Sequence, residues 1–158
     1  MATDGLTQQL ADRLAVADVI VRYFELVDAK RWDDMHEVFT EDTTAQWTAD
    51  NMIVGRDGVV GAMRHMSGSD EIVTYHHVAA MTPVVDGDAA SVVAHVRAMH
   101  HGVGPREGKF YESLGIQPTT LVRTPAGWRI KHHDWVIAVK HGNMEELFAP
   151  EIAAGKRH

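Results

Sequence analysis

The sequence predicts an α+β fold in which helices cover one face of a curved, mostly antiparallel sheet. Two patterns support this class. Near the N-terminus, apolar residues recur every three or four positions, as one face of a long helix requires. After Asp70 apolar and polar residues alternate, and the alternating segments are separated by turn sequences. No repeat or linker interrupts the chain, so we expect a single domain over residues 1–158.

Helices dominate the first half of the predicted order of elements. The long helix is expected to end at Asp28, a short second helix to cover 31–39, and a first strand to cover 43–49. A third helix is expected between Gly55 and Ser67. The apolar face of the long helix comprises Leu6, Leu10, Leu14, Ala17, Ile20, Phe24 and Val27.

Strands dominate the second half. The Asp-Gly sequence at 86–87 between two alternating segments is a strong hairpin signal, and a second turn is expected at 124–127. Residues 141–150 are predicted to form a terminal helix or a lid. We place the core of the domain at 6–148 and a tail at 149–158. The predicted long strands cover 72–85, 90–101, 110–123 and 128–139.

Composition excludes several classes of function. The net charge is -7, and no basic stripe is visible, so we expect no nucleic-acid partner. No signal peptide and no apolar segment of membrane-spanning length are visible, which predicts a cytoplasmic protein without a membrane partner. Cysteine is absent, which excludes a disulfide framework, a thiolate nucleophile and a cysteine-based metal site.

The chain contains 11 histidines, and their positions on strands suggest which can act chemically. His76 and His77 are neighbours on one predicted strand, so they point to opposite faces and at most one can enter a pocket. His100 ends an otherwise apolar face, where it is either a satisfied, partly buried residue or a proton-transfer group. Asp28 at the helix end is likewise either a local turn residue or a catalytic acid.

Several segments together resemble a known family. These are the first helix ending in Asp28, the following RWDDMHEVFTEDTTAQW, the TYHHVAA strand, the VVDGDAA turn and the closing GWRIKHHDW strand. They are similar to the SnoaL-like group of the nuclear-transport-factor-2-like superfamily. Within that group the similarity is to scytalone dehydratase and its bacterial relatives, with hexachlorocyclohexane dehydrochlorinase and bile-acid dehydratase nearby. The resemblance spans roughly residues 6–148.

The resemblance implies a conical barrel of curved sheet wrapped around the long N-terminal helix, with two further short helices. It implies one deep apolar pocket for a small-molecule substrate, no metal and no organic cofactor. It also implies a homodimer or homotrimer formed through the outer sheet face.

The resemblance also assigns roles to residues. Asp28 matches the helix-end aspartate of the family and His76 its catalytic histidine. His100 falls near a second pocket histidine, although a shift of one residue would select His101 instead. The substrate-binding positions implied in the same way are Tyr23, Val27, Trp47, Gln117, His133 and Phe148.

One departure from the family changes the expected chemistry. Val27 and Trp47 stand where scytalone dehydratase positions a water through two tyrosines, and neither can hold that water as a phenol does. A direct syn elimination or a proton shift suits these residues better. We therefore expect a cofactor-independent, dehydratase-like lyase that acts on a small cyclic or polycyclic apolar substrate.

In that reaction His76 would be the general base, oriented by Asp28, because an imidazole with an ordinary pKa of roughly 6.5 accepts protons at neutral pH. His100 or Gln117 would hydrogen-bond the leaving group or an enolate oxygen. The alternatives are an isomerase or cyclase that uses the same pocket, and a ligand-binding module without catalysis.

A metal site is the rival use of so many histidines. His95, His100, His132 and His133 lie on strands that could be adjacent, and neutral imidazoles bind zinc and iron. The HH doublets, however, place their two rings on opposite faces of a strand. We therefore expect no metal site.

Overall fold

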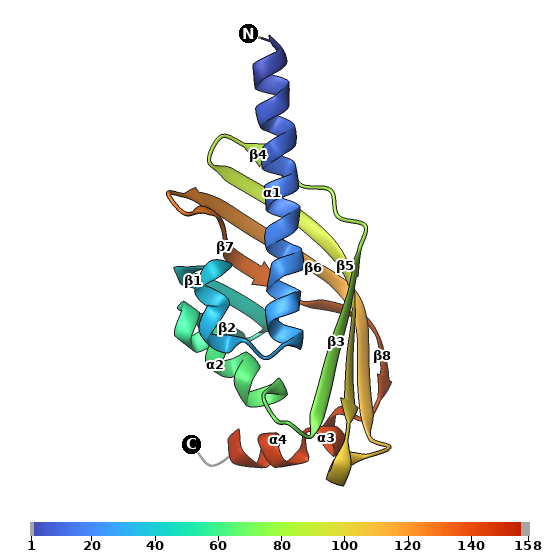
Figure 1. The fold of residues 1–158 in the computed structure, drawn as a ribbon. Helices are drawn as coiled ribbons and strands as arrows, with labels where there is room; N and C mark the ends of the chain where they lie inside the picture. The colour runs from blue at the N-terminus through green and yellow to red at the C-terminus, as the bar shows by residue number, and fades with distance from the viewer. Residues whose placement is uncertain (1, 156–158) are drawn as a thin grey trace.

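The longest element of the structure is the N-terminal helix. The computed structural model describes residues 2–155, and in it α1 (Ala2–Asp28) lies along the concave side of a curved sheet (Figure 1). Ile20 and Leu26 on its inner side are fully buried. The first turns extend beyond the sheet, so the predicted apolar face is covered only in part, and its exposed members are Leu6, Leu10 and Leu14.

The segment between α1 and the next α-helix contains one more strand than the sequence predicts. The predicted second helix is a 3-10 helix, η1 (Trp32–Glu37), and β1 (Phe39–Thr48) starts directly after it. The additional strand is β2 (Asn51–Val54), a mostly exposed strand of four residues that pairs with β1 and has no clear alternation. The third predicted helix is α2 (Arg56–Ser67).

Eight strands form one curved sheet in the order β2-β1-β7-β6-β5-β3, with β4 paired to β5 and β8 to β6. All pairs are antiparallel except β1 with β7, which confirms the predicted α+β class and mostly antiparallel sheet. The sheet stays open between β2 and β3 and does not close into a full barrel. The remaining strands are β3 (Ile72–Ala79), β4 (Val84–Asp86), β5 (Ala89–Gly102), β6 (Phe110–Thr124), β7 (Gly127–Asp134) and β8 (Val136–Gly142).

Two of the predicted long strands are interrupted in the structure. Residues 72–85 form β3 and β4, separated by a segment in which Ala80 has a φ of 49° and Pro83 has no N–H to donate. Residues 128–139 are divided at Trp135, because β7 and β8 pair with different halves of β6. The backbone of β8 passes so close to Gly115 that a Cβ there would lie 2.1 Å from the Val136 carbonyl oxygen.

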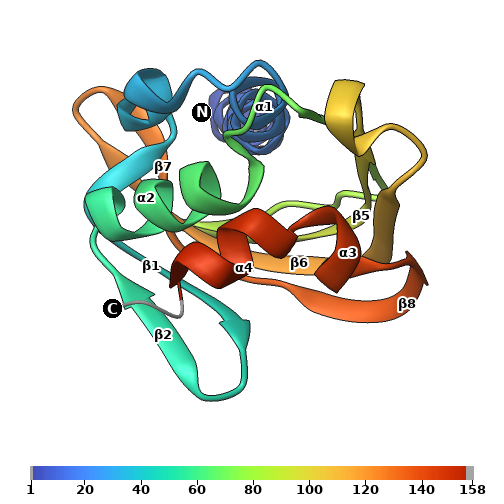
Figure 2. The same ribbon diagram turned by 90° about the horizontal axis from the view of Figure 1, so that it is seen from below.

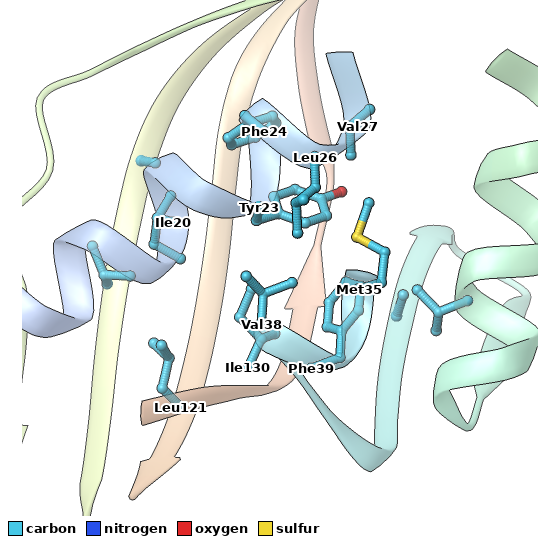
Figure 3. Packing of buried hydrophobic residues seen from close by; sticks show 14 of the residues in the cluster. Ile20, Tyr23, Phe24, Leu26, Val27, Met35, Val38, Phe39, Leu121 and Ile130 are labelled. Atoms are coloured by element: carbon cyan, nitrogen blue, oxygen red, sulfur yellow. The ribbon is translucent and has the colours of Figure 1, made fainter. Parts of the chain in front are cut away.

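The main core fills the space between α1 and the sheet (Figure 3). Each large apolar side chain that folding buries here contributes roughly 1.5–3 kcal/mol of stability. The same contacts fix where α1 ends relative to the strands. The labelled members of this core are Ile20, Tyr23, Phe24, Leu26, Val27, Met35, Val38, Phe39, Leu121 and Ile130.

The C-terminal residues 149–155 are a helix and not the predicted tail. They form α4 (Ala149–Gly155), which follows the short helix α3 (Met144–Leu147), and residues 156–158 lie outside the described part of the chain. Arg106 holds α4 in place by donating to both carboxylate oxygens of Glu151 at 2.8 and 2.9 Å. Figure 2 shows α4 beside α2, and the two helices are joined where the His65 ring meets the Glu151 carbonyl oxygen at 2.9 Å. Of the helices within residues 2–155, none combines the length and the apolar character that crossing a bilayer requires.

Candidate active site

The C-terminus of α1 and the middle of β3 meet at a carboxylate–imidazole pair. Asp28 Oδ1 lies 2.6 Å from His76 Nδ1, and Asp28 Oδ2 accepts the backbone N–H of His76 at 2.9 Å. The side chain of His76 is 9% exposed and that of Asp28 is 22% exposed. Since both carboxylate oxygens contact one residue, the carboxylate cannot rotate freely relative to the ring.

Asp28 is not needed to terminate the helix. The last carbonyls of α1 accept backbone N–H groups, from Lys30 to Val27 and from Arg31 to Leu26. Lys30 has a φ of 53°, the left-handed conformation in which many helices end. Both oxygens of Asp28 are thus available to His76, and the helix-end interpretation of this aspartate does not account for its contacts.

The pairing leaves one ring nitrogen of His76 for chemistry. Because the carboxylate accepts a hydrogen bond from Nδ1, the neutral ring carries its proton there and Nε2 has a free lone pair. The Phe24 ring packs at 4.9 Å from the His76 ring, centroid to centroid. An imidazole held in this way has the geometry that proton transfer at Nε2 requires.

His100, which is on β5, lies beside the Asp28–His76 pair, and its side chain faces the interior. Its ring is 5.8 Å from the His76 ring, at an interplanar angle of 90°, and 5.5 Å from the Phe148 ring. Burial and, after it, the charge of His76 lower the pKa of His100 to about 4, so His100 is neutral at pH 7. His101 is exposed and contacts Glu112, so the structure selects His100 of the two candidates.

A second buried polar group is centred on His133 of β7, which is 1% exposed. The indole N–H of Trp47 donates to His133 Nε2 at 3.2 Å, so the neutral ring carries its proton on Nδ1. Burial and, after it, the charge of His132 lower the pKa of His133 to about 3. The Tyr23 ring lies 5.5 Å from this imidazole, and its hydroxyl donates to the sulfur of Met63.

The site residues predicted from sequence therefore fall into two groups. Asp28, His76, His100 and Phe148 form one, and Tyr23, Trp47 and His133 form the other. Two further predicted residues are buried but lie in neither contact group. They are Val27, in the main core, and Gln117, on the inner face of β6.

Several buried residues of the inner face that carry a polar group were not predicted, among them three close to His100 in the sheet. Thr74 is 4% exposed, Tyr111 8% and Ser113 2%. The alternation of β3 would have identified Thr74, since it lies two residues before His76 on the same face. Tyr111 and Ser113 needed the pairing with β5, which sets Tyr111 opposite His100 and Ser113 opposite Ala98.

Two other features of the structure lie away from this site. His95 is exposed on the outer face, and the described residues contain no group of three or more potential metal ligands, so the four histidines of the metal alternative do not converge. A surface pocket of about 500 Å³ lies between η1 and α2, beside Trp32, Arg56 and Arg64. It contains none of the residues of the Asp28–His76 pair.

Comparisons with known proteins agree with this architecture. A protein of Mycobacterium tuberculosis strain H37Rv, Rv2910c, is 31% identical over 124 residues, which are 77% of this chain and 82% of the relative. The structure of a "Putative Scytalone Dehydratase" from Novosphingobium aromaticivorans has a TM-score of 0.76 at 19% identity, covering 90% of this chain and 92% of that one.

A second solved structure, the hexachlorocyclohexane dehydrochlorinase LinA-type3 from Novosphingobium barchaimii, has a TM-score of 0.73 at 12% identity, covering 85% and 91%. At these identities the two structures show a shared fold. The family model described as a SnoaL-like domain matches residues 8–134, which confirms the resemblance inferred from sequence. The chain belongs to the SnoaL-like family, with the fold of the nuclear-transport-factor-2-like superfamily.

Proposed function

We propose that this chain is a cofactor-independent lyase that eliminates a small leaving group from a cyclic or polycyclic apolar substrate. The observation that carries the proposal is the contact of both Asp28 oxygens with His76. A carboxylate at a helix C-terminus faces the negative end of the helix dipole, where it lowers stability by roughly 0.3–1 kcal/mol. A residue kept at such a cost, with one carboxylate oxygen on the imidazole of His76 and the other on its backbone N–H, fits a chemical role.

The proposed reaction begins at His76 Nε2, which removes a proton from a carbon next to an activating carbonyl group. Asp28 then stabilises the imidazolium that forms, since its carboxylate already contacts the other ring nitrogen. His100 is neutral and hydrogen-bonds the leaving group or the enolate oxygen. The names of the two structural neighbours, a dehydratase and a dehydrochlorinase, support an elimination.

An isomerase or a cyclase would use the same base without expelling a group. A proton shift needs only His76 and a donor to the developing oxyanion, and His100 supplies such a donor. The products distinguish the reactions, because elimination raises the number of double bonds and releases water or an acid. A module that only binds its ligand would show neither product.

The test begins with a ligand screen and ends with kinetics. Small aromatic, steroid and polyketide-like compounds are screened for thermal stabilisation, since a ligand that binds only the folded state raises its stability. Turnover of each hit is then followed by mass spectrometry. We expect His76→Ala to lower kcat by about 10²–10⁴-fold and Asp28→Asn to lower it by a similar factor.

The matched control is His77→Ala, because His77 is the exposed neighbour of His76 on the same strand. This variant should keep the wild-type rate. If His76→Ala and Asp28→Asn both retain full turnover, the assignment of the base is wrong.

A further inference from the structure

A hydroxyl, an imidazole and a carboxylate lie in series on the outer face of the sheet. Thr44 Oγ1 is 2.7 Å from His132 Nδ1, and His132 Nε2 is 2.9 Å from Asp134 Oδ1. Thr44 is on β1, and the other two residues are on β7, the neighbouring strand. Thr44 points away from the core, because the residues on either side of it, Thr43 and Ala45, are fully buried.

A β-bulge brings His132 to this outer face. Ile130 and His133 are both fully buried although they are three positions apart, and regular alternation would place them on opposite faces. The pairing of β7 with β6 shifts by one residue at Lys131, which reverses the alternation beyond it. Bulges of this kind often redirect a side chain next to an active site. Here the bulge turns His132 outward, where it meets Thr44.

The contacts fix the position of the ring proton. A carboxylate only accepts hydrogen bonds, so Nε2 of the neutral His132 ring donates to Asp134 and Nδ1 keeps its lone pair. The Thr44 hydroxyl therefore donates to Nδ1. Thr44 is half-buried, and the side chains of His132 and Asp134 are 28% and 35% exposed, so a small molecule in solvent can reach the hydroxyl.

These three groups are the parts of an activated nucleophile. A hydroxyl becomes reactive when a base within hydrogen-bond reach takes its proton and a third group orients that base. Such a constellation is recognised by its geometry and not by the order of its residues in the chain. Two adjacent strands of one sheet carry all three groups, which is a more precise support than a loop provides.

We propose that Thr44 is a nucleophile that accepts a small acyl group from an activated ester, with His132 as its general base and Asp134 as a positioning residue. Thr44 Oγ1 forms a bond to the carbonyl carbon, and its proton passes to His132 Nδ1. The bond between the carbonyl carbon and the leaving oxygen breaks, and that oxygen takes the proton from His132. The products are an ester on Thr44 and an alcohol or phenol. This activity is separate from the proposed lyase and does not depend on it.

The test treats the protein with 4-nitrophenyl acetate and locates the acetyl groups by peptide mass mapping. Hydroxylamine cleaves the ester expected on Thr44 and leaves acetylated lysines intact. We expect a hydroxylamine-sensitive acetyl group on Thr44 in the wild type. His132→Gln should lower the rate constant of this acetylation about 10²-fold, the contribution of a general base. Thr44→Ser should keep acetylation at position 44, and Thr44→Val should lose it.

The role of Asp134 is tested by two substitutions. Asp134→Asn should lower the same rate constant about tenfold, the value of one charge-assisted hydrogen bond. Asp134→Glu keeps the carboxylate and should react faster than Asp134→Asn. Equal rates in these two variants would exclude a role of the charge.

Thr40→Val is the matched control, because Thr40 is a half-buried threonine of the same strand whose hydroxyl donates to the backbone carbonyl of Ile130. It should leave the rate of acetylation at Thr44 unchanged. The proposal is overturned if the wild type carries no hydroxylamine-sensitive acetyl group on Thr44, or if His132→Gln acquires one at the wild-type rate.

Discussion

At the scale of single residues, the histidines of the inner face differ in what they can do. His76 is held by a carboxylate, whereas His100 and His133 are buried without an acidic partner in contact. Burial therefore keeps the last two neutral, with pKa values of about 4 and about 3. His76 is the one of these three whose ring nitrogen contacts a carboxylate.

The buried neutral histidines predict a specific dependence of stability on pH. A histidine of an unfolded chain has a pKa near 6.5, so between about pH 4 and 6.5 the unfolded state binds protons that His100 and His133 in the folded state do not. The free energy of unfolding should therefore fall by a few kcal/mol as the pH drops through that range. Urea denaturation at several pH values measures it.

Removing one titrating group tests the cause. His133→Phe should make the free energy of unfolding depend less steeply on pH over this range. This holds whether or not the substitution changes the free energy of unfolding at pH 7. Leu14→Gln serves as the control, because Leu14 is exposed and this change removes no titrating group. An unchanged slope in His133→Phe would rule out His133 as a source.

At the scale of elements, the C-terminal helices cover the His100 side of the site and depend on one buried arginine. The Arg106 side chain is 8% exposed and contacts Glu151, the Leu147 carbonyl oxygen and Glu71. It therefore connects the β5–β6 loop and the start of β3 to α3 and α4. Phe148, which packs on His100, is held in place by the same connection.

Loss of Arg106 should release these helices. Arg106→Met leaves the largely buried Glu151 carboxylate without its partner, which costs about 3–5 kcal/mol, whereas Glu71 is 43% exposed and adds little. We expect faster amide hydrogen exchange in residues 144–155 than in the rest of the chain. Arg97→Met is the control, since the Arg97–Glu112 pair is exposed and surface pairs contribute at most about 1 kcal/mol. Equal exchange in the two variants would contradict this role.

At the scale of the whole molecule, the outer face of the sheet carries apolar side chains that the single chain leaves exposed. They lie on three strands, β3, β5 and β8, with polar residues such as Arg97 and Glu112 between them, and exposed apolar side chains rimmed by polar ones are typical of interaction sites. The self-association expected from the sequence would bury them. These side chains are Val73, Tyr75, Val93, Val136 and Val139, each 45–57% exposed.

We therefore predict a homodimer or homotrimer formed through this face. Light scattering coupled to size-exclusion chromatography measures the mass, and Tyr75→Glu combined with Val93→Glu should lower it to that of one chain. Leu14→Glu is the control, because Leu14 is exposed on α1 and lies off the sheet. A single-chain mass in the wild type would refute the prediction.

The sequence alone determined the features that depend on local periodicity. Alternation along a strand has a period of two residues, so the opposite directions of His76 and His77 followed without any partner strand, whereas the choice between His100 and His101 did not. The helical spacing and the Asp-Gly turn likewise predicted α1 and the β4–β5 hairpin, because each depends on residues close in the chain.

The tertiary structure decided whatever depends on partners distant in sequence. The contact of Asp28 with His76 spans 48 residues, and the break at Trp135 exists because β7 and β8 pair with different halves of β6. Residues 149–155 are helical where Arg106 anchors them. Such contacts depend on which surfaces meet after folding, and a local pattern of residue types does not contain that information.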